Sequence, residues 1–428
     1  GVQTCALPIS LTTTQLASLE TTDLQSISTT NIAAMTTTQV RSLSATQIGS
    51  LTDTQVLALT TAQIQALTNT QVKGLEETDL ASFSTTQINA LSTGQIQALE
   101  TTDLQALTTT SIAQLSNTLL KALTATQIGD LADTQVLALT ETQLGQLGGT
   151  QIRGFEVTDL GTLTTTQLSL LSSTQISAFN TTQVKALGDT QFSGLSTTQI
   201  TGFTSTQLNA LETTDLQALT TTQVANLSTT QVKGLAATQI TALTDAQVSA
   251  LTSAQLSVLT NTQVQALETT DFAALTTTQL GGLTATQLSA LDATDLGSLT
   301  ETSIAALSTT QLKGLTATQV GSLGDTQVLA LTETQINSLS VTQVKGFETT
   351  DLGTLTTTQL SQLTTTQVAA FTATQIKALG DTQFAGLSTT QVSGLTATQI
   401  ALLETTDLQA LTTTQVAGLS TTQVKGLS

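Results

Sequence analysis

From Thr13 to Ser428 the chain consists of 52 consecutive octapeptide units (octads), from TTQLASLE to TTQVKGLS, without an insertion or a deletion. Position 4 is Leu, Ile, Val or Phe in all 52 octads, and position 7 is apolar in all of them. Position 3 is Gln or Asp in 48 octads, and position 2 is nearly always Thr. A fixed period of this kind indicates a repeat architecture, in which each unit buries its apolar face against neighbouring units.

One continuous helix is incompatible with this period. Eight residues make about 2.2 helical turns, so each octad would rotate its apolar pair by roughly 80° and no apolar stripe would persist. The composition also excludes an ordinary mixed core, because aromatic residues are 2% of the chain and Trp and Tyr are absent. The 39% of hydrophobic residues is too high for a charged disordered tail. The core must therefore be aliphatic and repeated many times.

The octad carries the signature of a short capped helix. Ser or Thr at position 8 is followed three residues later by Gln or Asp, which is the capping-box pattern, as in Thr12 and Gln15 or Ser84 and Gln87. The apolar positions follow three residues apart on one helical face. Of the 29 acids, 28 lie at positions 8, 1 or 3, and all ten bases lie at position 5. This polarity suits a helix N-terminus, so we predict a repeat solenoid of the α type, with one very short helix per octad.

A β-solenoid is the alternative fold. The hydroxyl side chains at positions 8 and 2 form a T-x-T row that would suit a ladder of strands. Strict alternation, however, places positions 4 and 7 on opposite faces, so the β form needs a corner at positions 5 and 6. Disorder is the third possibility, since helices this short are unstable alone and persist only by stacking.

A second rhythm overlies the octads. In nine octads position 3 is Asp, and each of these Asp residues is preceded three residues earlier by another acid. Paired carboxylates supply the oxygen ligands that Ca²⁺ prefers, although no D-x-D-x-D-G loop is present. The candidate calcium ligands are Glu20, Asp23, Glu76, Asp79, Glu100, Asp103, Glu156, Asp159, Glu212, Asp215, Glu268, Asp271, Asp292, Asp295, Glu348, Asp351, Glu404 and Asp407. The other explanation is that both acids of a pair face water in the first turn of a helix.

The spacing of the acid pairs makes a prediction about the coil. Successive pairs lie 7, 3, 7, 7, 7, 3, 7 and 7 octads apart, which defines a superperiod of 192 residues. About 3.4 octads per turn would bring steps of 3 and 7 close to one and two turns, and the pairs would form a stripe. Duplication of a 192-residue block explains the same spacing without any stripe, and residues 125–236 are nearly repeated at 317–428.

The residues that carry most enzyme chemistry are missing. The sequence has no His, and its single Cys, Cys5, lies outside the array. The abundant Ser and Thr sit in a uniform lattice in which no hydroxyl has a distinct base beside it, as nucleophilic catalysis requires. We therefore expect no enzyme activity, no catalytic residues and no cofactor apart from the calcium candidate. The net charge of −19 argues against a nucleic-acid partner, and no stretch reaches 18 consecutive apolar residues.

The first ten residues, GVQTCALPIS, differ from everything after them and hold the only Pro and the only Cys. They resemble the conceptual translation of a sequencing adapter, typical of badly trimmed metagenomic reading frames. We interpret residues 1–10 as such an artefact. The true N-terminal and C-terminal regions are then expected to be missing. Residues 11–428 are predicted to form one octapeptide-repeat solenoid.

The consensus L-[ST]-x-T-Q-[IVL]-x-[AGS]-L resembles the octad arrays of large bacterial surface proteins that are often labelled heme utilisation or adhesion proteins. The resemblance covers residues 11–428 and implies an extracellular stalk, spacer, adhesin or matrix component that self-associates or binds cell-surface partners. Heme finds no support in the residues, because His and Tyr are absent and Met35 stands alone. The alternative function is a repetitive surface that binds polysaccharide, mineral or ice through the T-x-T rows of the β form.

Overall fold

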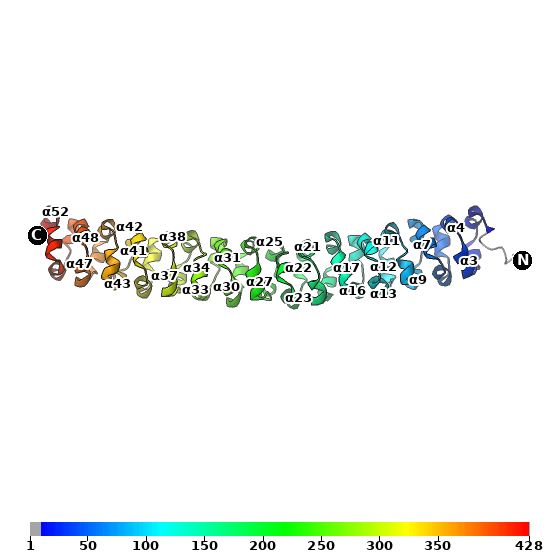
Figure 1. Cartoon of the computed structure of the whole chain (residues 1–428), viewed down its shortest axis with the longest axis horizontal. Coiled ribbons are helices and arrows are strands. Elements are labelled where there is room, and N and C mark those ends of the chain that lie inside the picture. Colours follow the sequence, from blue (N-terminus) through cyan, green and yellow to red (C-terminus); the bar gives the residue numbers. More distant parts are fainter. Residues whose placement is uncertain (1–9, 428) are drawn as a thin grey trace. The chain divides into compact units, whose positions relative to one another are not determined.

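A computed structural model describes residues 10–427, and these residues form 52 short helices, one in each octad (Figure 1). The helices begin eight residues apart, from Thr13 for α1 to Thr421 for α52. Nine helices have four residues: α8, α10, α18, α24, α32, α34, α35, α42 and α49. Twenty-one have six residues: α3, α4, α7, α9, α11, α12, α14, α17, α19, α21, α23, α27, α30, α33, α37, α38, α41, α43, α47, α48 and α50. The remaining helices have five residues.

The capping box predicted from the sequence sets where each helix begins. In α41 (Glu333–Ser338), the backbone N–H of Gln335 donates to Thr332 Oγ1 at 3.3 Å, and the backbone N–H of Thr332 donates to Gln335 Oε1 at 2.7 Å. Thr332 is extended, with φ −69° and ψ 156°, and Leu339 returns to φ −59° and ψ 142° after the helix. The N-cap residue is extended in every octad, so the chain cannot continue as one helix.

The fold is an α-type repeat solenoid, as predicted, and the β-solenoid alternative is wrong. Residues 10–427 contain no strand, and the only extended backbone in a typical octad lies at its caps. The physical reason is that the hydroxyl at position 8 caps the next helix through its own side chain, so it does not enter a ladder of strands. The T-x-T ladder surface on which the alternative function depended is consequently absent from the described chain.

The apolar positions of the octad form the core. Ile336 at position 4 is 0% exposed and Leu339 at position 7 is 4% exposed, and equivalent side chains are buried along nearly all of residues 10–427. Burying an aliphatic side chain of this size contributes roughly 1.5–3 kcal/mol. The few aromatic rings pack within the same core, where the ring centroids of Phe192 and Phe203 lie 6.2 Å apart. Two buried side chains per octad thus replace the large core of an ordinary domain.

Within each unit, most helices pack on the helices three octads before and after them. Helix α41, for example, contacts α38 (Thr309–Gly314) and α44 (Thr357–Ser361). The side chain of Gln335 in α41, however, hydrogen-bonds to residues of the octad four units earlier, in and after α37 (Glu301–Ala306). One turn of the coil therefore holds between three and four octads, a range that includes the predicted 3.4.

The contacts divide the chain into two units, residues 1–219 and 220–428, and the same pattern holds inside each. The prediction of a single solenoid over residues 11–428 remains a prediction. The proposed adapter segment, residues 1–10, lies outside the described residues except for Ser10.

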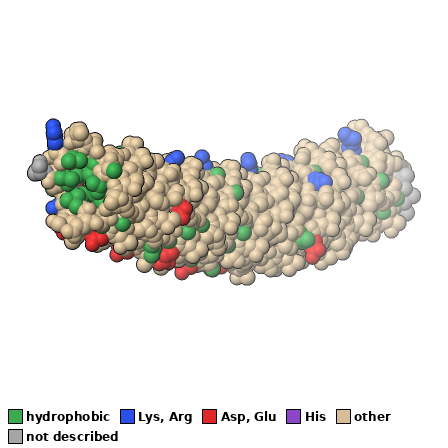
Figure 2. All heavy atoms as spheres, turned by 60° about the vertical axis from the view of Figure 1, so that its left-hand side comes forward, with side chains coloured by type: hydrophobic (Ala, Val, Ile, Leu, Met, Phe, Trp, Pro, Cys, Tyr) green, Lys and Arg blue, Asp and Glu red, His purple; other side chains and the backbone are tan. Residues whose placement is uncertain are grey.

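Basic and acidic side chains lie on different sides of the coil. In the C-terminal unit, drawn nearest the viewer in Figure 2, Lys and Arg gather near the upper edge and Asp and Glu near the lower edge. The bases of this unit include Lys313, Lys345 and Lys377, which follow one another at four octads and are all exposed. Position 5 faces solvent because positions 4 and 7 of the same octad are turned into the core. None of the helices formed by residues 10–427 has the length and apolar character to cross a membrane.

Candidate functional site

Gln at position 3 has a second role beyond the capping box. Its side chain is buried, and its Nε2 amide donates to the backbone carbonyls of positions 4 and 7 in the octad four units earlier. Gln335 shows both bonds, to Ile304 O and Leu307 O at 2.8 Å each. Gln191 makes the equivalent bonds to Leu160 O at 2.9 Å and Leu163 O at 2.7 Å. We call this pair of bonds the amide tie, because it joins one turn of the coil to the preceding turn.

A second set of bonds runs in the other direction along the coil. Polar side chains at position 5 donate to the backbone carbonyl at position 6 of the octad three units later. Examples are Asn337 Nδ2 to Gln362 O at 2.7 Å and Gln97 Nε2 to Ala122 O at 2.8 Å. These bonds occur only where position 5 carries a suitable donor, whereas the amide tie recurs with nearly every Gln at position 3.

The octads with Asp at position 3 (Asp octads) keep the cap and lose the amide tie. In α43 (Thr349–Thr354), the backbone N–H of Glu348 donates to Asp351 Oδ2 at 2.8 Å, which is half of a capping box. An ionised carboxylate has no N–H to donate, so it cannot form the tie to the carbonyls of Val320 and Leu323 in the octad four units earlier. The side chain is nevertheless only 1% exposed.

Each buried carboxylate of the Asp octads also meets an acid from the helix three octads earlier. Asp351 lies close enough to Asp325 of α40 (Asp325–Leu329) to interact with its carboxyl group. The same relation, over 26 residues of sequence, recurs in seven Asp octads: Asp53 with Asp79, Glu77 with Asp103, Asp133 with Asp159, Asp189 with Asp215, Asp245 with Asp271, Asp325 with Asp351, and Asp381 with Asp407.

This environment favours the protonated carboxyl group. Burial raises the pKa of Asp79, Asp159 and Asp351 to about 6, opposed by the hydrogen bond from the N-cap backbone and aided by the neighbouring acids. The same cause raises the pKa above its ordinary value at the five remaining buried or half-buried sites, Asp103, Asp215, Asp271, Asp295 and Asp407. Two Asp octads depart from the pattern: Asp295 faces Thr269, whose Oγ1 donates to Asp295 Oδ1 at 3.4 Å, and Asp23 is exposed.

The structure gives the two members of most candidate calcium pairs different exposure to solvent. The N-cap acids, such as Glu348 and Glu76, are exposed, while their Asp partners at position 3, apart from Asp23, are turned toward the core. Across residues 10–427 no three or more carboxylates, thiols or imidazoles are grouped so that they could hold a metal ion. The third acid, 26 residues before the Asp, was not predicted from the sequence. Calcium binding by the nine pairs remains a prediction.

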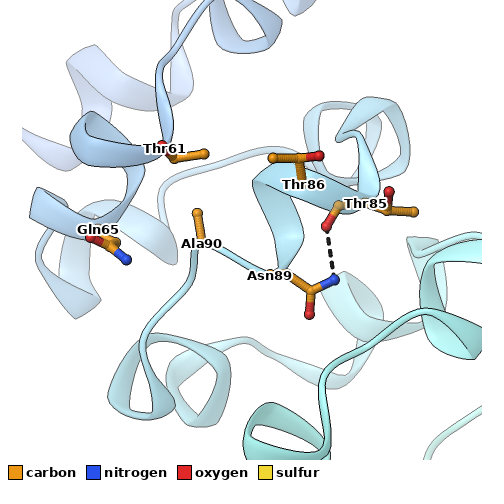
Figure 3. A pocket seen from close by; sticks show the side chains of 6 residues that line it. All are labelled: Thr61, Gln65, Thr85, Thr86, Asn89 and Ala90. Carbon is orange, nitrogen blue, oxygen red and sulfur yellow. Dashed lines mark hydrogen bonds between the residues drawn. The ribbon is translucent and has the colours of Figure 1, made fainter.

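Shallow polar grooves run between helices three octads apart. One groove, of about 480 Å³, lies between α7 (Thr61–Ala66) and α10 (Thr85–Ile88). Figure 3 shows Thr61, Thr86 and Asn89 around it, with the Asn89 amide donating to the backbone carbonyl of Thr85 at 2.9 Å. An equivalent groove of about 440 Å³ is lined by Thr and Ser of α20 (Thr165–Ser169) and α23 (Asp189–Gly194). Neither groove contains an acid–base pair.

Comparison with known proteins identifies the repeat. The family model described as the ALTTAQ repeat matches seven stretches that together cover more than half of the chain: residues 16–53, 72–109, 152–189, 208–245, 264–301, 344–381 and 400–428. Each stretch begins four residues before one of the acid pairs, and the starts recur with the 192-residue superperiod. A search of curated proteins gives no match.

Proposed function

The chain belongs to the ALTTAQ repeat family, and from this premise we propose that it is a structural or adhesive extracellular repeat region, a stalk, spacer or matrix component of a bacterial surface protein. The observation that carries the proposal is the amide tie. Within each unit it joins octads four units apart by the same kind of bonds, as in Gln335 and Gln191, so turns can be added without any change of fold. A spacer needs this property, because its function scales with its length.

The surface supports the same role. The described side chains offer a net acidic exterior with many hydroxyl groups and few exposed large apolar residues, such as Leu57 and Leu329. Such an exterior suits a molecule that stays dissolved and projects another part of a protein. The uniform lattice of Ser and Thr, without His, supports the further proposal that the chain is not an enzyme.

A deletion in phase with the superperiod tests the spacer proposal. Removing residues 125–316 joins Thr124 to Ala317 at an octad boundary and takes out 24 of the 52 octads. The maximum dimension from small-angle X-ray scattering should fall by a little under half, with the circular dichroism per residue unchanged. A maximum dimension that shrinks only with the cube root of chain length would show a compact body and contradict a spacer.

The alternative function, a repetitive surface that binds a periodic polymer, now has a different basis. With the Thr ladder absent from residues 10–427, only the hydroxyl-lined grooves, as at Thr61 and Thr86, favour it. Co-sedimentation with insoluble polysaccharides tests this function, and binding that is lost in a Thr61→Val, Thr86→Val variant but kept in a variant at Thr357 outside that groove would support it. Equal binding by the two variants would contradict polymer binding in that groove.

A further inference from the structure

The Asp octads differ from the Gln octads in two ways that act on the same contact between turns. They lack the amide tie to the octad four units earlier, and in seven cases they face an acid on the helix three octads earlier. At α43, therefore, both neighbours in the preceding turn are affected: the octad of residues 317–324 loses a donor, and α40 presents Asp325. No octad with Gln at position 3 combines a missing amide tie with a facing acid.

The contacts between turns are local, which makes such differences matter. The contacts between turns join octads three and four units apart, so breaking the contact at one octad does not require breaking those further along. A lost tie therefore lowers the free energy needed to open that turn, and it has little effect on turns two or more away.

We propose that eight of the nine Asp octads are preset joints, at which the solenoid opens first while the Gln-tied segments between them stay closed; Asp23 is left out because no octad stands four units before it. The joints in residues 10–219 lie at α9 (Glu77–Ser82), α12 (Thr101–Ala106), α19 (Val157–Thr162) and α26 (Thr213–Gln217). Those in residues 220–427 lie at α33 (Thr269–Ala274), α36 (Ala293–Gly297), α43 and α50 (Thr405–Ala410). The joints are spaced by three or seven octads, so the segments between them in each unit have two lengths.

Charge is a separate part of the joint from the missing amide. Ser303 in α37 also lacks an amide at position 3, but it is neutral and its hydroxyl pairs with Thr300 Oγ1 at 3.0 Å. At Asp351 a carboxylate takes this place, with Asp325 and Glu348 as its acidic neighbours. A lost tie alone leaves a gap in the bonding, whereas the seven Asp octads that face an acid add repulsion between the turns.

Hydrogen exchange on the full chain at pH 7.5 in the presence of EDTA tests the joints. The backbone amides that close α43, such as Leu355 N–H to Leu352 O, should exchange about tenfold faster than those that close α41, such as Leu339 N–H to Ile336 O. The Asp351→Gln variant restores the consensus residue and should slow exchange at α43 and in residues 317–324 by about the same factor. Exchange in α41 should not change.

Two further variants separate the effect of the facing charge from a general effect of substitution on the fold. Asp325→Asn removes the facing acid and should slow exchange at α43 several-fold. Glu333→Gln removes an acid at the same octad position that faces no Asp, and it should leave α43 unchanged. Equal protection of α43 and α41 in the unaltered chain overturns the proposal, and so does an Asp351→Gln variant whose exchange at α43 is the same as before.

Discussion

Gln335 joins two turns of the coil with one side chain. Its Oε1 accepts from the backbone N–H of Thr332 at 2.7 Å, and its Nε2 donates to Ile304 O and Leu307 O, both at 2.8 Å. The amide is 2% exposed, so neither end of it can turn to water instead. One residue type therefore fixes both the start of its helix and the stacking of that helix on the turn before.

This double role predicts the effect of Gln335→Glu. The carboxylate keeps the cap but places a negative charge against two carbonyl oxygens that have lost their donor, so we expect local opening to become easier by about 2–4 kcal/mol. Hydrogen exchange of residues 301–308 and 333–340 measures this change in the free energy of local opening. Gln409→Glu, at an exposed position 5, is the control and should change little. Similar small changes in both variants would contradict the amide tie.

Much of the octad's local structure could be predicted from the sequence, because the capping box and the i, i+3 apolar pair act within eight residues. The tie was missed although it leaves a signal: no octad has Glu at position 3. A capping box accepts Glu as well as Gln, so the absence of Glu indicates that the N–H₂ group is needed. The facing acids, such as Asp325 and Asp351, could not be paired because the partner depends on octads per turn, which no local pattern fixes.

The buried carboxylates predict a pH dependence of stability. Burial raises the pKa of Asp79, Asp159 and Asp351 to about 6 in the folded chain, above the ordinary value of 3.8. Between those values the folded chain binds protons that the unfolded chain does not bind, so stability is highest below about pH 4 and falls as pH rises through 6. The charged groups that act on Asp351 are Glu348 and Asp325.

Thermal unfolding at pH 4.5 and pH 7.5 measures this dependence. The melting temperature should be higher at pH 4.5, and the difference should shrink in a chain carrying Asp79→Gln, Asp159→Gln and Asp351→Gln together. Glu141→Gln, Glu301→Gln and Glu333→Gln remove three position-1 acids that face no Asp, and this control should keep most of the difference. An equal reduction in both triple variants would assign the effect to general charge repulsion.

The calcium hypothesis makes a different prediction. A Ca²⁺ ion shared by paired carboxylates would offset their repulsion, so millimolar Ca²⁺ should raise the melting temperature at pH 7.5, and Mg²⁺, which demands stricter geometry, should raise it less. The rise should diminish when Glu348 and Asp351 are replaced by Gln. Melting curves and circular dichroism that are the same with EDTA and with millimolar Ca²⁺ would remove all nine pairs as calcium sites.

The close approach of successive turns predicts the effect of Gly346→Val. A side chain at Gly346 would overlap the backbone carbonyl of Ala317, at position 1 of the octad three units earlier, and the same close approach joins Gly154 to Ala125. Backbone atoms cannot move aside as a flexible side chain can, so the two turns must separate, at a cost of about 1–3 kcal/mol.

Gly380→Val, where the only neighbour within 4 Å is the end of a Gln side chain, is the control for valine in the octad. Thermal unfolding and hydrogen exchange of residues 317–324 should distinguish them, because only the clash at Gly346 acts between turns. Equal destabilisation by both substitutions would show that glycine is kept for a reason other than the approach of the coils.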